Sequence, residues 1–154
     1  MKKYIFKQFN KKIINLALIL LVSGCSTYNK VFLSSDFSTI YTAKFGGSKQ
    51  NGFKHIKDNE SYIKTIDSLK IDASNFGKLA LVDFNSNDIL ILYLGEQNNS
   101  GFSIDIESIH EENEKIIVTR KINSPSEKDS VKIEITSPYS ISIIPKTKKV
   151  TFIE

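Results

Sequence analysis

The side chains of this sequence that could do chemistry in solution are gathered in one short run. His110 is followed by Glu111, Glu112 and Glu114, and an imidazole with three carboxylates at this spacing could hold a metal ion. The same residues also make up an ordinary solvated hairpin tip, where carboxylates repel one another at little cost. His55 is the only other histidine, and both histidines are expected to lie in loops. We therefore favour the hairpin tip and expect no metal site.

Motifs for covalent catalysis and for phosphate binding are missing from the sequence. It has no Gly-x-Ser-x-Gly segment, no glycine-rich phosphate loop, and no cysteine and histidine spacing typical of zinc sites. These absences lower the expectation of catalysis. The sequence predicts a protein that is not an enzyme and that needs no cofactor.

Cys25 is the one cysteine of the chain, so no disulfide can form within it. It follows five lysines, an apolar run at 13–22 that is too short to cross a bilayer comfortably, and two small residues. This order predicts a secretory signal peptide over residues 1–24. The segment Val22-Ser23-Gly24-Cys25 resembles the bacterial lipobox, which implies cleavage before the cysteine and attachment of acyl chains such as palmitate. The alternatives are an ordinary signal with a chance cysteine, or a signal anchor.

The lipobox resemblance implies a location in the cell envelope, on the periplasmic side or the cell surface of a bacterial membrane. Residues 25–35 would then be the lipidated cysteine and a short tether, and two or three acyl chains give stable anchoring. Without residues 1–24, 16 of the 21 basic residues remain against 17 acidic ones, which changes the formal net charge from +4 to −1. A nearly neutral mature chain gives no electrostatic reason to expect a nucleic-acid partner.

Residues 36–154 are expected to form a single β-rich domain. Short apolar or alternating runs are separated by turn residues about every ten positions, which is typical of an antiparallel β-sandwich or small barrel. The segment 58–70 has apolar residues at helical spacing behind a capping residue, Asp58 or Asn59, so one helix should pack on the sheet. The fold class is thus β-rich α+β. Strands are expected at 37–45, 79–84, 88–94, 101–107, 115–123, 130–137, 139–144 and 149–153.

The stretch 88–109 carries the clearest strand signals. Residues 88–94 are almost wholly apolar, which fits a strand covered on both faces. Residues 101–107 alternate between apolar and polar, which predicts one dry face, and the break at Ser108 predicts a bulge or a strand end. A polar loop, 95–101, should join these strands as a hairpin. The alternating strands place these side chains in the core: Phe102, Ile104, Ile106, Val131, Ile133, Ile135, Tyr139 and Ile141.

The same stretch resembles the PrcB C-terminal domain. The matching residues are Leu94-Gly95-Glu96, Gly101-Phe102-Ser103-Ile104 and Glu107-Ser108-Ile109, followed by shorter matches around Pro138, Pro145 and Phe152, so the resemblance covers residues 79–152. That family usually has Thr-Gly-Gly-Tyr where this chain has Asn99-Ser100-Gly101-Phe102. PrcB-like proteins are bacterial lipoproteins that are partners of a protease complex.

The resemblance implies a membrane-anchored protein-binding module that stabilises or helps to mature an exported protease, with a subtilisin-like enzyme as one candidate. The partner is expected to contact the polar loop, through Gln97, Asn98, Asn99, Gly101 and Phe102. The ordinary alternative for this loop is a tolerated insertion between two strands. The alternatives for the protein are a structural or small-ligand-binding lipoprotein, or an inhibitor that inserts the loop into a protease cleft.

Overall fold

The computed structural model describes residues 30–31, 37–69, 71, 73–79, 82–112, 115–127 and 129–153. Two short helical segments, α3 (Phe76–Leu79) and the 3-10 turn η2 (Ala73–Asn75), follow the main helix α2 (Asn59–Ser68). The strands are β1 (Lys30–Val31), β2 (Ser38–Ala43), β3 (Gly52–Ile56), β4 (Asn87–Tyr93), β5 (Ser103–Glu112), β6 (Lys115–Asn123), β7 (Tyr139–Pro145) and β8 (Lys149–Ile153).

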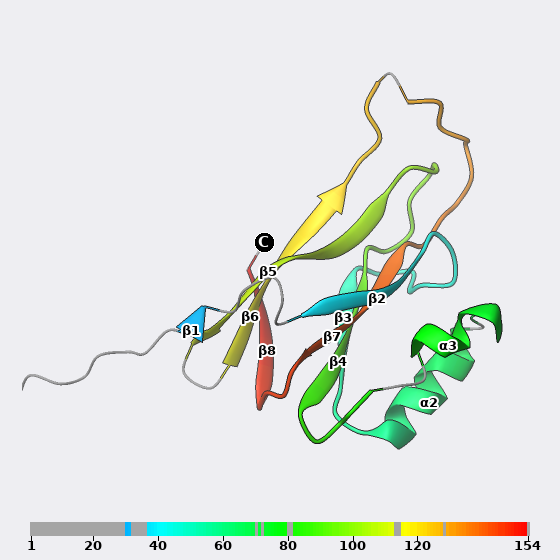
Figure 1. Cartoon of the computed structure of the whole chain (residues 1–154). Helices are drawn as coiled ribbons and strands as arrows, with labels where there is room; N and C mark the ends of the chain where they lie inside the picture. The colour runs from blue at the N-terminus through cyan, green and yellow to red at the C-terminus, as the bar shows by residue number, and fades with distance from the viewer. Residues whose placement is uncertain are drawn as a thin grey trace, which may run out of the picture.

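The strands form two four-stranded sheets, in the orders β2-β7-β4-β3 and β1-β5-β6-β8. Figure 1 shows the first sheet between the helices on one side and the second sheet on the other. The prediction of a β-rich sandwich with one helix packed on it is confirmed, and the sheets do not close into a barrel. Each side of the middle sheet faces an apolar cluster of its own, one shared with the helices and one shared with the other sheet.

Strand β4 is covered on both faces, as its continuous apolar sequence predicts. Ile89 and Ile91 lie in the cluster shared with α2, while Leu90 and Leu92 lie in the cluster between the sheets. All four side chains are 0% exposed. Because successive side chains of a strand point to opposite faces, only an unbroken apolar run can fill both clusters.

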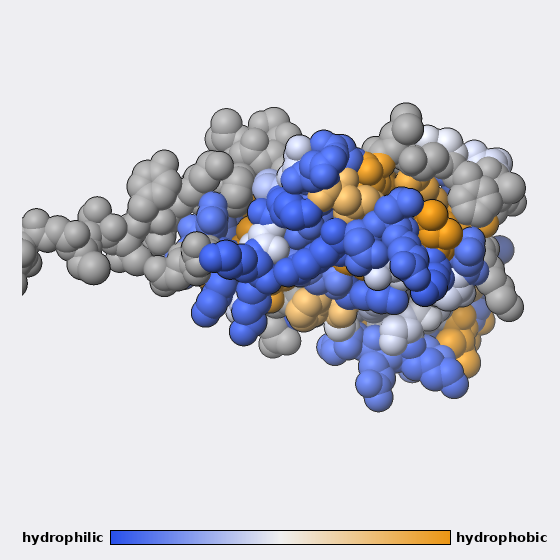
Figure 2. Space-filling view, turned by 90° about the horizontal axis from the view of Figure 1, so that it is seen from below, coloured by the Kyte–Doolittle hydropathy of each residue, from blue (hydrophilic) through white to orange (hydrophobic). Residues whose placement is uncertain are grey.

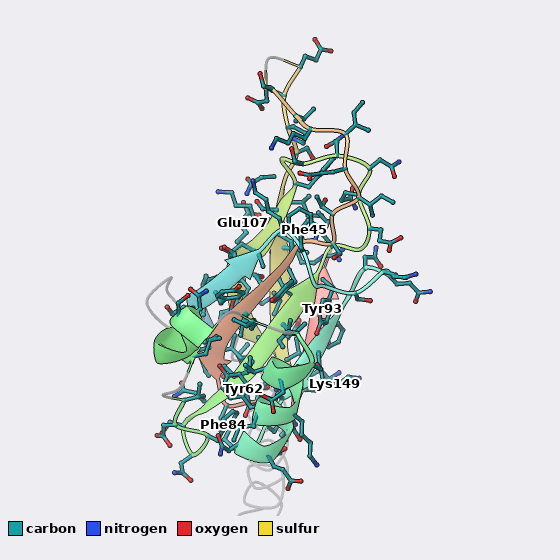
Figure 3. All side chains as sticks on the ribbon, turned by 90° about the vertical axis from the view of Figure 1, so that its right-hand side faces the viewer. Phe45, Tyr62, Phe84, Tyr93, Glu107 and Lys149 are labelled. Carbon is teal, nitrogen blue, oxygen red and sulfur yellow. The ribbon has the colours of Figure 1, made fainter. Side chains whose placement is uncertain are left out.

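Helix α2 begins where the sequence predicts, and of the two candidate caps it is Asp58 that caps it. The Asp58 carboxylate accepts hydrogen bonds from the backbone N–H of Ser61 at 2.8 Å and from its hydroxyl at 2.9 Å. That backbone hydrogen bond lowers the pKa of Asp58 from its ordinary value. The helix buries Tyr62 and Ile66 against the middle sheet, and Figure 3 shows Tyr62 beside Phe84, with their ring centroids 5.7 Å apart.

Several strand predictions are confirmed closely. Strand β6 has the predicted bounds 115–123, and β8 the predicted bounds 149–153. The register of β5 against β6 shifts between Ile106 and Ser108, which is the expected bulge. Beyond the bulge β5 continues to Glu112, and it forms a hairpin with β6 in which Glu112 pairs with Lys115.

The predicted hairpin of β4 and β5 is wrong. Strand β4 pairs with β3 and β7, while β5 pairs with β1 and β6 in the other sheet. The loop 95–101 therefore carries the chain from one sheet to the other. The expectation of purely antiparallel pairing is also wrong in one place, since β6 and β8 run parallel. Pairing between strands that are distant in the sequence leaves no mark on the local sequence pattern.

The described residues of the segment 79–84 form no strand, so the predicted strand there is wrong. Helix α3 ends at Leu79, and Asp83 forms a turn in which its carboxylate accepts from the backbone N–H of Asn85 at 3.0 Å. Leu79 still fills the cluster beneath the helices, with Val82 and Phe84 packed against it. A short apolar run does not distinguish a strand from a buried helical turn, which explains the error.

The predicted core strand at 130–137 is also wrong. This segment belongs to neither sheet, although its backbone is bonded to the loop 95–101. Ile133 is 96% exposed, Ile135 70% and Val131 37%. The other predicted core residues fare better: Ile104, Ile106, Tyr139 and Ile141 are buried, and Phe102 is half-buried.

The signal peptide at 1–24 and the lipid site at Cys25 lie outside the described residues. Lys30 and Val31, which belong to the predicted tether, form β1 and pair with Glu111 and His110 of β5. In the part of the chain that the structure describes, no helix is both long enough and apolar enough to cross a membrane.

The hydroxyl of Tyr62 generates a prediction about stability at high pH. It donates to the backbone carbonyl of Leu79 at 2.8 Å, and burial raises the pKa of Tyr62 to about 12. The folded state therefore favours the neutral phenol, so its contribution to the free energy of unfolding is complete below about pH 10 and is lost as the pH rises towards 12. We expect Tyr62→Phe to lower the free energy of unfolding at pH 7 by roughly 1–3 kcal/mol, because the buried carbonyl loses its donor.

Urea denaturation from pH 8 to 12 checks this prediction. The decline in stability above pH 10 should be shallower in Tyr62→Phe than in the wild type. Some decline should persist in both, because burial also raises the pKa of Tyr93 and of Tyr139. Parallel pH profiles would show that Tyr62 ionises as readily in the folded state as in the unfolded state.

Candidate functional site

Two segments lie side by side at one end of the sandwich. One is the loop 95–101, and the other is the segment between β6 and β7, residues 124–137, which we call the arm. Figure 1 shows the arm extending beyond the ends of β5 and β6 and returning past the loop to β7. Both segments join strands of different sheets, so this end is where the chain crosses between layers.

Backbone hydrogen bonds fasten the loop to the arm. Gln97 and Thr136 exchange two of them, each 2.9 Å long, as an isolated antiparallel bridge. Further along, the N–H of Ser100 donates to the carbonyl of Lys132 at 2.9 Å, and the N–H of Lys132 donates to the Ser100 hydroxyl at 3.0 Å. The loop thus has a partner along much of its length, unlike a tolerated insertion with a free backbone.

A glycine at each end of the loop allows its backbone to pass close to a neighbouring segment. Gly95 has φ of 86°, and a Cβ there would lie 2.9 Å from the backbone nitrogen of Asn51. Gly101 has φ of 102°, and a Cβ there would lie 2.9 Å from Pro125 and 3.2 Å from Val131 of the arm. Both the backbone conformation and the space therefore call for glycine at each end of the loop.

The predicted contact residues Gln97, Asn98 and Asn99 are brought together on this loop, in different environments. Asn98 is exposed and Gln97 half-buried, and the side chain of neither forms a hydrogen bond with the described residues. Asn99 is half-buried; its carbonyl accepts from the Thr136 hydroxyl at 3.1 Å, while its Oδ1 is buried without a partner among the described residues. The loop thus has a fixed backbone and two uncommitted polar side chains.

The other two predicted residues, Gly101 and Phe102, line a hollow of about 380 Å³ beside the loop. Its remaining walls are Ser103, the end of β2 with the residue after it (42–44), and Tyr139. The Tyr139 ring lies 6.0 Å from that of Tyr41 and 6.3 Å from that of Tyr93, and burial raises the pKa of Tyr139, so its phenol stays neutral. The hollow has no charged group except Lys44, and its lining suits a side chain or a small neutral group.

Exposed apolar side chains concentrate at this end. Seven large apolar residues are exposed in the described part of the chain, and five of them lie on the arm or next to it: Phe45, Ile122, Val131, Ile133 and Ile135. Figure 3 shows Phe45 beside the base of the arm. The opposite end, seen from below in Figure 2, has a broad hydrophilic surface across its middle. Contiguous exposed apolar side chains are typical of surfaces that contact another molecule.

The outer part of the arm contains a turn of its own. The Asp129 carboxylate accepts from the backbone N–H of Ser126 at 2.7 Å and from its hydroxyl at 2.9 Å, and the N–H of Asp129 returns a bond to the Ser126 carbonyl. The bond from the Ser126 N–H lowers the pKa of Asp129 from its ordinary value. This turn lets the arm reverse direction without the support of either sheet.

Both histidines lie in strands, so their expected placement in loops is wrong. His110 is on β5 next to Glu111 and Glu112, and no three histidine, cysteine or acidic side chains of the described residues gather as a metal site would require. His55 is on β3, and its Nε2 lies 2.8 Å from Oδ2 of Asp88, which is 0% exposed. The local sequence does not reveal this pair, because the two residues are 33 positions apart.

The pair of His55 and Asp88 holds the turn between β7 and β8. Oδ2 of Asp88 also accepts from the backbone N–H of Thr147 at 3.1 Å, and the Lys146 ammonium lies 3.9 Å from Oδ1. A histidine beside a buried aspartate could orient a nucleophile, but no hydroxyl of the described residues forms a hydrogen bond to His55. The contacts of the pair are those of a structural clamp.

The apolar side chains of the arm are the other feature whose predicted position is wrong. Val131, Ile133 and Ile135 alternate with polar residues as in a core strand, and alternation does not tell which face is dry. Two prolines enclose the segment, Pro125 on one side and Pro138 on the other. Proline at both ends is a signal for a segment outside the sheets, because it interrupts the backbone ladder.

A family model described as PrcB C-terminal matches residues 89–145, which confirms the predicted resemblance. The match is shorter than the predicted range 79–152; it begins within β4, ends with β7, and contains both the loop and the arm. No curated protein and no solved structure matches the chain. Similarity to this family indicates a protein associated with a protease complex.

Gly101 generates a prediction about the joint between the loop and the arm. We expect Gly101→Ala to lower the free energy of unfolding by roughly 1–3 kcal/mol, because alanine is strained at this φ and its Cβ would meet Pro125. Gly77→Ala in α3 is the matched control, since a Cβ there meets nothing within 4 Å and alanine suits a helix. Urea denaturation measures both. Equal free energies of unfolding for the two variants would mean that the contact between the loop and the arm adapts to the added Cβ without loss of stability.

Proposed function

We propose that this chain is a lipid-anchored protein-binding module, not an enzyme, and that its partner is an exported protease which it stabilises or helps to mature. One observation carries the proposal. Within the segment that matches the PrcB C-terminal family, a loop has its backbone held by the arm while the side chains of Gln97 and Asn98 are free to bind. A loop that is already ordered loses little entropy on binding, which favours affinity.

The position of β1 determines how an anchor at Cys25 would orient the domain. Strand β1 begins five residues after this cysteine, and Lys30 pairs with Glu111 near the end of β5 that is remote from the loop. The strand from Ser103 to Glu111 spans about 27 Å at 3.4 Å per residue. Acyl chains on Cys25 would therefore hold the remote end near the membrane, and the loop and the arm would face away from it, towards a partner.

The alternative functions receive less support from the geometry. An inhibitory loop would have to project into a cleft, whereas the loop 95–101 lies against the arm. A small-ligand protein would use the hollow beside Phe102 and Tyr139, whose volume of about 380 Å³ is at the low end for ligand pockets. The exposed apolar residues next to the loop favour a protein partner.

The loop generates the main test of this proposal. We expect the double variant Gln97→Ala with Asn98→Ala to capture the protease at least about fivefold less well, because only uncommitted side chains are removed and the backbone bridge to Thr136 remains. Capture is measured by co-purification of tagged full-length protein from detergent-solubilised membranes, with identification of the protease by mass spectrometry. Stability should stay within about 0.5 kcal/mol of the wild type.

Asn59→Ala is the matched control, since Asn59 is an exposed polar residue at the start of α2. It should capture the protease as well as the wild type does. If the wild type captures no exported protease, the proposed function is wrong. If the wild type and the double variant capture it equally, the loop is only a connector.

The lipid anchor requires its own experiment. We expect Cys25→Ser to abolish acylation, so that the protein becomes soluble or remains unprocessed, because serine offers no thiol for the acyl chains. Membrane fractionation and intact mass measure the change, and Ser26→Ala is the control that should leave acylation intact. A Cys25→Ser protein of mature size in the membrane fraction would refute the lipid anchor.

A further inference from the structure

The arm has two backbone edges, and the loop occupies only one of them. Lys132 and Thr136 point their N–H and C=O groups at the loop, where both residues are hydrogen-bonded. Lys132 and Thr136 are four positions apart and both bond to the loop, as in a chain whose successive residues direct these groups to opposite sides. Those of Val131, Ile133 and Ile135 therefore point to the other edge, and they form no hydrogen bond with the described residues.

The side chains along the same segment have a regular order. Val131, Ile133 and Ile135 share one face and are exposed, with Ile133 at 96%. Lys132 and Glu134 alternate with them on the other face and carry opposite charges. The free edge thus combines three unpaired peptide groups, three exposed apolar side chains, and one charge of each sign.

We propose that this free edge of the arm binds an extended segment of the protease partner by strand addition. An extended peptide presents its backbone donors and acceptors at every second residue, which is the spacing of the free groups on the arm. Unpaired strand edges bind extended peptides by forming these backbone hydrogen bonds. The loop, the arm and the added segment would form three neighbouring strands. This inference rests on the proposed function, because it names how the same partner is held.

The arm specifies what the segment must contain. In the antiparallel orientation, apolar residues of the segment lie opposite Val131, Ile133 and Ile135. Between them, an acidic residue lies opposite Lys132 and a basic residue opposite Glu134, since cross-strand pairs of opposite charge are favourable. The segment therefore reads apolar, basic, apolar, acidic, apolar from its N-terminus.

A second copy of the arm would also satisfy this order, because residues 131–135 read Val-Lys-Ile-Glu-Ile. Antiparallel pairing of two arms would turn one molecule end for end, since the arm returns from its tip towards β7 along the length of the molecule (Figure 1). The two β1 strands, and with them two lipid anchors, would then lie at opposite ends. Copies anchored in one membrane could not pair in this way, which favours a segment of another protein.

Proline variants test the backbone pairing in the full-length protein. Ile133→Pro removes an N–H that points to the free edge and keeps an apolar side chain. Ser130→Pro is the matched control, because Ser130 lies outside the run 131–135 and its N–H forms no bond with the described residues. We expect Ile133→Pro to capture the protease roughly five- to thirtyfold less well than the wild type, and Ser130→Pro to capture it within about twofold.

A synthetic peptide tests the edge without the protease. The probe is a fluorescent peptide with the sequence of residues 129–137, which has the required order, and its binding to detergent-solubilised full-length protein is followed by anisotropy. In that register its central apolar residues direct their amides at the arm. Methylating these amides should abolish binding, and methylating those of the lysine and glutamate between them should preserve it.

The outcomes separate the inference from the proposed function. Capture of the protease by the wild type and equally by Ile133→Pro would overturn strand addition while leaving the proposed function intact. A peptide that fails to bind at millimolar concentration, or that binds regardless of which amides are methylated, would also overturn it. A wild-type dimer in sedimentation that is lost in Ile133→Pro would overturn the partner segment and make a second copy the occupant.

Discussion

Burial of β4 on both faces is the constraint on which the rest of the structure depends. Its four central side chains are fully buried, two against the helices and two against the second sheet. The free energy gained is about 1.5–3 kcal/mol for each side chain. A strand with no wet face requires a layer on each side, so α2 and the second sheet are both consequences of one apolar run. The buried Asp88 at its start is held by His55 and the Thr147 N–H, which tie β3 and the β7–β8 turn to it.

The candidate site follows from the same layering. Strands β4 and β5 lie in different sheets, so the chain must cross between layers after Tyr93, and it does so through the loop 95–101. It crosses back between β6 and β7 through the arm. Neither crossing belongs to one of the two four-stranded sheets, and each satisfies part of its backbone hydrogen bonding on the other. The loop and the arm thereby hold each other in place and form a small ordered surface.

The parts of this fold that could be predicted are those whose signal is local. Asp58 and the apolar spacing behind it locate α2, and the unbroken run of β4 predicts a strand covered twice. The predictions that failed concern features that depend on residues distant in the sequence. The alternation in 131–135 has the period of a strand, but it does not tell whether the segment lies inside a sheet or outside both. The pairing of Gln97 with Thr136 joins residues 39 positions apart. The contact residues on the loop could be proposed from the family resemblance, whereas the exposed arm beside them could not.

The exposure of Ile133 shows why the arm is more than a connector. An ordinary connection between strands is polar, because exposed apolar side chains and a free strand edge invite aggregation. This one keeps three apolar residues outward, and its own constraints limit the hazard. Prolines enclose the segment, charged residues alternate along it, and a turn at Asp129 ends it. The free edge is therefore short and charged enough to disfavour unspecific pairing while it stays open to one matching strand. The loop contributes to this selectivity, since its bonds to Lys132 and Thr136 hold this part of the arm in place.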